Sequence, residues 1–140
     1  MNKKVMIGAI AVYVWVAVWE MIVNNAFLMG DYMATAHLWR PEAEIKIWLF
    51  FIVYIFMAYF LSVIFSKGYE GKGASEGARF GLYVGLLLAT PMAYGTYAVM
   101  PIPYALALKW FCFGIIEYIV AGVILAMVYG KQAMVAKAAA

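Results

Sequence analysis

Two acidic residues, Glu20 and Glu117, lie inside long apolar segments of this 140-residue sequence. If those segments cross a membrane, each carboxyl group costs roughly 2.5–3.5 kcal/mol to insert and is expected to face other helices. Asn24 lies one helical turn after Glu20, and Tyr118 follows Glu117 directly. We therefore predict an intramembrane polar cluster of Glu20, Asn24, Glu117 and Tyr118.

Such a cluster has two interpretations, and both stay open at the level of sequence. A pair of buried carboxyl groups can bind and release a proton or a cation, which would make it a transport site. Alternatively, protonated carboxyl groups can hydrogen-bond Asn24, Tyr118 or the backbone and hold the helices together. Neither interpretation requires a cofactor.

A second group of polar residues, Asp31, His37 and Arg40, follows the first apolar segment. His37 is the only histidine and Cys112 the only cysteine, too few ligands for a bis-histidine haem or a structural zinc site. The sequence shows no set of nucleophile, base and acid that would form a catalytic triad. The sequence therefore predicts no metal and no cofactor. A membrane enzyme that acts on a lipid or a quinone stays a third, less favoured class, because Asp31, His37 and Arg40 are the only polar cluster that could serve it.

Glycines at four-residue spacing, Gly77, Gly81 and Gly85, predict a helix face that packs closely against another helix. Gly114 and Ala121 flank Glu117 on its own helix face and predict a protein neighbour there as well. The glycine-rich stretch before this face matches neither a Walker sequence nor a dinucleotide fingerprint. We expect Ser75 to cap the helix that follows, with Glu76 in its first turn.

The elements that must position these residues are four apolar stretches, predicted as helices at about residues 5–29, 46–66, 79–100 and 105–129. Apolar residues make up 69% of the chain and charged residues 12%, whereas soluble domains have about 45–50% and ~25%. Each stretch has the ~20 residues that a helix needs to cross a hydrocarbon core. The fold class is thus predicted to be all-α, a single transmembrane domain over residues 1–140 in the form of an integral membrane four-helix bundle.

The basic residues predict the orientation of this bundle. Seven fall on the side of the termini and three on the other side, which favours N-in and C-in under the positive-inside rule. Pro41 followed by the acidic Glu42 is typical of a helix start, so we expect the second helix to begin there. Glu42 and Lys46 would then form an i,i+4 ion pair on its surface.

Three features carry a resemblance to a known group. These are an Asn- and aromatic-rich end to the first helix, a Gly-punctuated last helix, and a Gly-rich loop that leads into Glu76-Gly77-Ala78-Arg79-Phe80-Gly81. In these the chain resembles small four-helix bacterial membrane proteins grouped as domains of unknown function. The resemblance implies a multi-pass protein of the bacterial cytoplasmic membrane and brings no activity with it. Small multidrug-resistance transporters are similar in having four helices and a glutamate in the first, an analogy of architecture alone.

The sequence therefore predicts a non-enzymatic polytopic membrane protein that acts as a homo-oligomer or as a subunit of a larger membrane complex. Its expected partners are the lipid bilayer and either further copies of the chain or other membrane subunits, and not nucleic acid. The alternative is a small transporter or channel for protons, cations or a hydrophobic solute that uses the intramembrane glutamates.

Overall fold

The computed structural model of the protein describes residues 2–138, and their side chains as far as residue 130. All regular structure in this part of the chain is helical, which confirms the all-α prediction. Four of its helices are long and apolar enough to cross a membrane. The elements are α1 (Lys3–Ile22), a π-helical turn (Val23–Phe27), α2 (Met29–Ala34), 3₁₀ turns at Ala36–Leu38 and Glu42–Glu44, α3 (Ile47–Gly68), α4 (Ala74–Val99) and α5 (Tyr104–Ala138).

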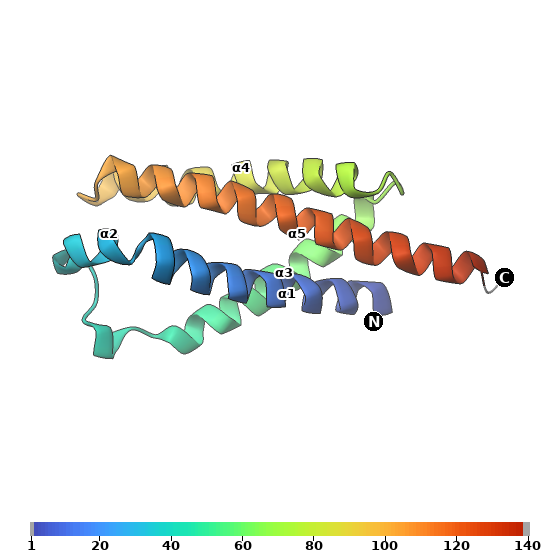
Figure 1. The fold of residues 1–140 in the computed structure, drawn as a ribbon, viewed down its shortest axis with the longest axis horizontal. Coiled ribbons are helices and arrows are strands. Elements are labelled where there is room, and N and C mark those ends of the chain that lie inside the picture. The colour runs from blue at the N-terminus through green and yellow to red at the C-terminus, as the bar shows by residue number, and fades with distance from the viewer. Residues whose placement is uncertain (1, 139–140) are drawn as a thin grey trace.

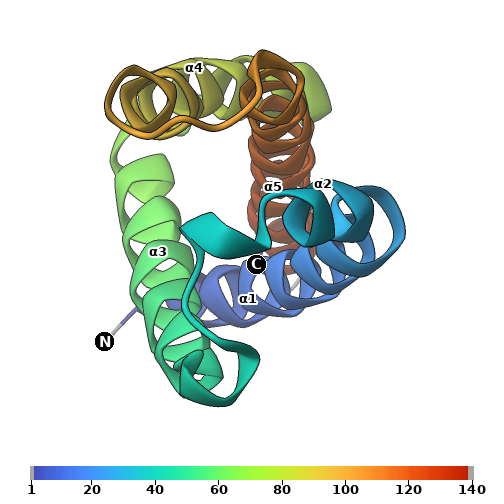
Figure 2. The same cartoon turned by 90° about the vertical axis from the view of Figure 1, so that its left-hand side faces the viewer.

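The long helices run side by side along the longest axis of the molecule (Figure 1). α1 begins near the loop that joins α3 to α4, and α5 runs past this loop at the same end, which we call the α3–α4 loop end. The opposite end, the α2 end, holds α2 and the turn between α4 and α5. Viewed from the α2 end, the tilted helices form the four sides of a square in the order α3, α1, α5, α4 (Figure 2).

Neighbouring helices pack very unequally around this square. α4 and α5 share the most extensive interface, followed by α1 with α3 and then α1 with α5. α3 and α4 meet at the α3–α4 loop end, where the rings of Phe65 and Phe80 lie 5.1 Å apart. The fold is therefore two helix pairs joined through α1 and α5.

Glycines on α4 explain the close approach of α4 and α5. A Cβ atom at Gly77 would lie 2.3 Å from the backbone oxygen of Gly122, and one at Gly81 would lie 2.1 Å from that of Tyr118. A Cβ atom at Gly85 would lie 3.2 Å from the Cα atom of Ile115. The glycine stripe thus packs on a helix of the same chain, because only a bare backbone fits there.

The predicted first helix does not continue as an α-helix to residue 29. The side-chain amides of Asn24 and Asn25 donate to the carbonyl oxygens of Glu20 and Met21, which residues 24 and 25 would otherwise bond through their backbone N–H groups. The backbone widens to a π turn, in which the N–H of Leu28 bonds the oxygen of Val23 at 3.0 Å. Side chains that compete for helical carbonyls produce this kind of local change.

The prediction that the second helix begins at Pro41 was wrong. Residues 42–44 form a single 3₁₀ turn, and Ile45 and Lys46 have non-helical backbone angles before α3 begins at Ile47. Glu42 and Lys46 are therefore not an i,i+4 pair. Every side chain from Pro41 to Phe50 is exposed, so no burial stabilises a longer helix in the segment before Ile47.

The prediction that Ser75 caps the next helix was also wrong. Gly73, with a φ of 75°, takes the cap position, and Ser75 lies inside the first turn of α4. Glu76 is in that turn as expected, with only 6% of its surface exposed. Its carboxylate turns back to accept the backbone N–H groups of Glu70 and Lys72 at 2.6 and 2.7 Å, which ties the loop to the helix.

Candidate functional site

The fold brings the two acidic residues of the apolar segments together where α1 packs on α5. Glu117 is 5% exposed and Glu20 is half-buried. Their carboxyl groups lie within hydrogen-bonding reach of one another. Two carboxyl groups can share a hydrogen bond only if one of them carries a proton, because an ionised carboxylate has no donor.

Asn24 fixes the orientation of Glu20. Its amide nitrogen donates to the Oε2 atom of Glu20 at 2.7 Å and to the carbonyl oxygen of the same residue at 2.8 Å. The amide oxygen of Asn24 accepts from the Tyr32 hydroxyl at 2.9 Å. Asn24 thus holds one carboxylate oxygen of Glu20, and the carboxyl group of Glu20 remains within reach of Glu117.

Tyr32 extends this hydrogen-bonded chain to the α2 end. Its hydroxyl oxygen accepts from the indole Nε1 of Trp110 at 3.0 Å, so the chain joins α1, α2 and α5. Burial raises the pKa of the Tyr32 hydroxyl above its usual value. The hydroxyl consequently stays protonated at neutral pH and remains a donor to Asn24.

Tyr118, which the sequence placed in the same cluster, makes a different contact. Its hydroxyl donates to the sulfur of Met57 on α3 at 3.1 Å instead of to a carboxyl oxygen. The backbone oxygen of Glu117 accepts from the indole of Trp15 at 3.0 Å. α5 is thus held to α3 by Tyr118 and to α1 by Trp15 on either side of the carboxyl pair.

Trp19 presents a buried hydrogen-bond donor beside this site. Its Nε1 atom is buried and has no hydrogen-bond partner among the described residues. The ring stacks on Trp15 at 5.2 Å and meets Phe113, one turn before Glu117, at 6.2 Å. An unpaired buried donor is uncommon in folded proteins and is what a small polar molecule would satisfy.

Towards the α3–α4 loop end, apolar side chains close the site. Val12, Val16 and Leu125 are fully buried there, and the small side chains of Ala58 and Ala121 complete the packing. This block of five residues, which we call the apolar core, separates Glu117 from the polar groups at the other end. The site is therefore polar on its α2 side and apolar on the opposite side.

A second polar cluster lies beyond the apolar core. The buried hydroxyl of Ser62 donates to the carbonyl oxygen of Val5 at 2.9 Å, and the Tyr129 hydroxyl donates to the Ser62 carbonyl at 3.2 Å. Gly8 makes room for this contact, since a Cβ atom there would lie 2.6 Å from the Ser62 hydroxyl oxygen. This cluster could not be predicted from the sequence, because a serine, a tyrosine and a glycine are common in apolar helices.

The remaining predicted residues take separate places. Gly114 packs against Ala89 of α4, and Ala121 belongs to the apolar core. On α2, Asp31 accepts from the ammonium group of Lys109 of α5 at 2.6 Å and so fastens α2 to the bundle.

His37 and Arg40 are exposed and do not join Asp31 in a common site. Among residues 2–138, no three His, Cys, Asp or Glu side chains are grouped so that they could hold a metal ion.

No family model matches the sequence, and neither a curated protein nor a solved structure shows significant similarity to it. The functional argument therefore depends on the residues and contacts described above.

Proposed function

We propose that this chain is a small membrane transporter in which the Glu20–Glu117 carboxyl pair binds and releases a proton. The observation that carries the proposal is the meeting of two carboxyl groups between apolar helices, with one of them positioned by Asn24. Ionisable groups in such surroundings are expensive, and their usual use is in ion or proton pathways. A purely structural hydrogen bond between α1 and α5 would not need two acids.

The four apolar helices are proposed to cross the cytoplasmic membrane of a bacterium with both ends of the chain in the cytoplasm. Basic side chains gather at the α3–α4 loop end, namely Lys3, Lys4, Lys67, Lys72 and Arg79. The α2 end has Arg40, Lys46 and Lys109, of which Lys109 is neutralised by Asp31. An excess of basic residues is typical of the cytoplasmic side.

In this orientation the carboxyl pair is reached from the outside. Tyr32 and Asn24 lead from the α2 end to Glu20, and the unpaired Trp19 donor offers a place for a water molecule beside them. The apolar core blocks release to the other side. Passage to the cytoplasm would require α1 and α5 to separate around Val16 and Leu125, which would connect the pair to the Ser62–Tyr129 cluster.

Proton flux in proteoliposomes tests the proposal. We expect the purified protein to dissipate a pH gradient, measured with an entrapped pH-sensitive dye, and Glu20→Gln and Glu117→Gln each to reduce the rate to that of protein-free vesicles. Glu42→Gln is the matched control, because Glu42 is exposed and lies outside the long helices. Unchanged flux in both buried-acid variants would rule out the carboxyl mechanism.

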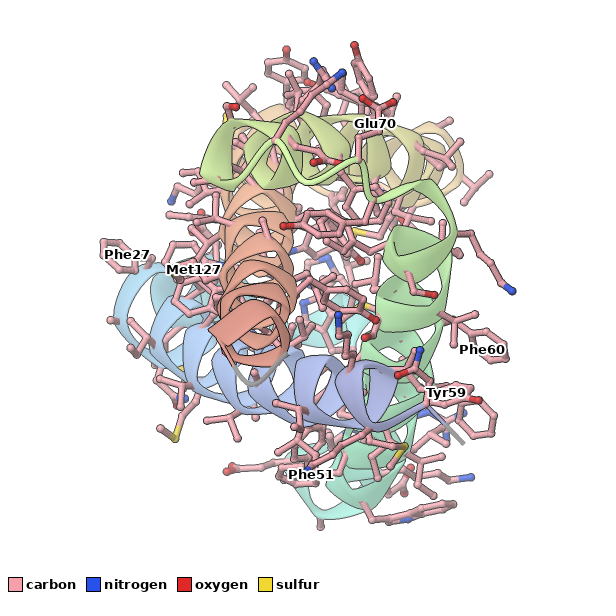
Figure 3. All side chains as sticks on the ribbon, turned by 90° about the vertical axis from the view of Figure 1, so that its right-hand side faces the viewer. Phe27, Phe51, Tyr59, Phe60, Glu70 and Met127 are labelled. Carbon is pink, nitrogen blue, oxygen red and sulfur yellow. The ribbon has the colours of Figure 1, made fainter. Side chains whose placement is uncertain are left out.

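An assembly role is the second candidate, and one observation favours it. Between Ile47 and Phe56, all side chains of α3 except Tyr54 are exposed, so this half of the helix has almost no protein neighbour within the chain. Phe51 is an example, at 47% exposed, and Phe60, one turn beyond this segment, is 52% exposed (Figure 3). We propose that a second copy or another membrane subunit covers part of this surface.

Size measurement after mild detergent extraction tests the assembly role. We expect a particle larger than one chain plus its detergent belt, as determined by light scattering. A strictly monomeric particle without a co-purifying subunit would contradict it.

A further inference from the structure

A groove opens between α3 and α4 at the α3–α4 loop end. It has a volume of about 160 Å³, and its apolar wall is formed by Ile64, Phe65, Phe80 and Tyr83. The charged residues Glu70, Glu76 and Arg79 line the same groove. The groove is therefore amphipathic, with an apolar wall on the helices and charges near the loop.

The two carboxylates of the groove are already engaged. Glu76 accepts two backbone N–H groups of the loop, and Glu70, which lies on that loop (Figure 3), forms an ion pair with Lys72. The neighbouring Lys72 ammonium lowers the pKa of the Glu70 carboxyl. Loop groups therefore stabilise both carboxylates, and Arg79 adds a smaller attraction to Glu70 without forming an ion pair with it.

Arg79 is the cation that this arrangement leaves available. The ion pairs within the described part of the chain join Lys72 to Glu70 and Lys109 to Asp31, and Arg79 is in neither. Its side chain is exposed and lines the groove, and Lys67, which is also exposed, lies on the last turn of α3 at the same end of the molecule. A guanidinium group binds a phosphate through paired hydrogen bonds.

We propose that this groove binds an anionic phospholipid, with the phosphate on Arg79 and an acyl chain along Ile64, Phe80 and Tyr83. An apolar wall directly below an arginine suits a molecule that is charged at one end and apolar at the other, and a free phosphate would use only the arginine. Since α3 and α4 meet through Phe65 and Phe80 and have little contact elsewhere, the bound lipid would fill the space between them. The inference rests on the proposed membrane insertion and is independent of proton transport.

Native mass spectrometry of the detergent-solubilised full chain provides the test. With phosphatidylglycerol added, we expect one tightly bound lipid, and with phosphatidylcholine of the same acyl chains we expect much weaker binding. Arg79→Gln should weaken phosphatidylglycerol binding by about tenfold, the usual effect of removing one charge-assisted contact. Arg40→Gln, the same change at the α2 end, should leave it unaltered.

Two outcomes would overturn the inference. Equal phosphatidylglycerol binding by Arg79→Gln and Arg40→Gln would remove the groove as the site. Displacement of the lipid by glycerol phosphate, which lacks acyl chains, would assign the site to a free phosphate. Flotation of the same protein with liposomes tests insertion separately, so a protein that floats but binds no anionic lipid contradicts this inference alone.

Discussion

At the scale of single residues, Asn24 determines what Glu20 can do. A side-chain amide has a donor end and an acceptor end, and here the donor end faces Glu20 while the acceptor end faces Tyr32. This arrangement holds one oxygen of Glu20 and so restricts the orientation of the carboxyl group beside Glu117. We therefore expect Tyr32 to influence the carboxyl pair through Asn24, although Tyr32 hydrogen-bonds neither acid.

Replacing Tyr32 with phenylalanine tests this dependence. We expect Tyr32→Phe to lower the free energy of unfolding by about 1 kcal/mol, because Trp110 and Asn24 each lose a partner. We also expect the pH midpoint of the proposed proton flux to shift, since Asn24 would be free to turn away from Glu20. Unfolding in mixed micelles followed by circular dichroism, together with flux measured across pH, gives both values.

The control for this change is Tyr97→Phe. Tyr97 lies on α4 near the same end of the molecule, is 43% exposed and contacts the ring of Tyr104. Its hydroxyl is not needed for that ring contact, so neither stability nor the pH profile should change. A pH profile that is identical in Tyr32→Phe and the original protein would show that Tyr32 does not influence the carboxyl pair.

At the scale of elements, the α4–α5 interface depends on backbone contact. Gly81→Ala would place a methyl group 2.1 Å from the Tyr118 carbonyl oxygen, so the helices must move apart. Overpacking of this kind costs roughly 1–3 kcal/mol, and we expect a loss of at least that size. Resistance to unfolding by sodium dodecyl sulfate measures it.

Gly95→Ala is a matched control on the same helix. A Cβ atom at Gly95 meets nothing within 4 Å, so the substitution should stabilise the helix slightly, by about 0.5–1 kcal/mol, through its helix propensity. The two alanine substitutions are thus expected to have effects of opposite sign. Equal effects would mean that the close contact at Gly81 does not stabilise the α4–α5 pair.

The loop between α3 and α4 has its own stabilising residue in Glu76. We expect Glu76→Gln to reduce stability by about 1–2 kcal/mol, because an amide has one acceptor oxygen for the two backbone N–H groups that the carboxylate now accepts. Limited proteolysis should then cut near Gly71 and Lys72 sooner than in the original chain. Glu44→Gln, in the exposed 3₁₀ turn, should leave the rate of cleavage in this loop unaltered.

The long helices could be predicted from the sequence because twenty apolar residues in a row permit few other structures. Their ends were harder to predict, and each error has a local cause. The apolar stretch predicted from about residue 79 begins five residues after the start of α4 at Ala74, because the first turns of α4 are polar and glycine-rich and Gly77 packs its bare backbone against Gly122. The π turn at Asn24 depends on two side-chain bonds, which apolar periodicity does not report.

At the scale of the whole molecule, the pairing of helices decides which polar residues meet. The sequence indicated that Glu20 and Glu117 could meet only if the first and last helices pack together, and it contained no means of choosing that pairing. Tyr32 and Trp19 were not singled out, because aromatic residues near helix ends are common in membrane proteins. Their roles follow from α2 folding back on α5, a contact that Asp31 and Lys109 fix from opposite ends of the sequence.

The orientation of the bundle determines from which side the carboxyl pair is reached, and single cysteines can establish it. In a Cys112→Ser background, which removes the exposed native thiol, His37→Cys reports on the α2 end and Ser75→Cys on the α3–α4 loop end. Both positions are exposed, so a difference in labelling reflects the membrane and not burial.

With both ends of the chain in the cytoplasm, a membrane-impermeant maleimide added to intact bacteria should label His37→Cys at once and Ser75→Cys only after lysis. The reverse pattern would contradict the positive-inside argument and would open the Glu20 site to the cytoplasm instead. Labelling of both positions in intact cells would mean that the chain inserts in two orientations. Any net transport would then have to come from copies that face in opposite directions. The proposed path through Tyr32 and Asn24 therefore has a defined direction only if the first pattern is found.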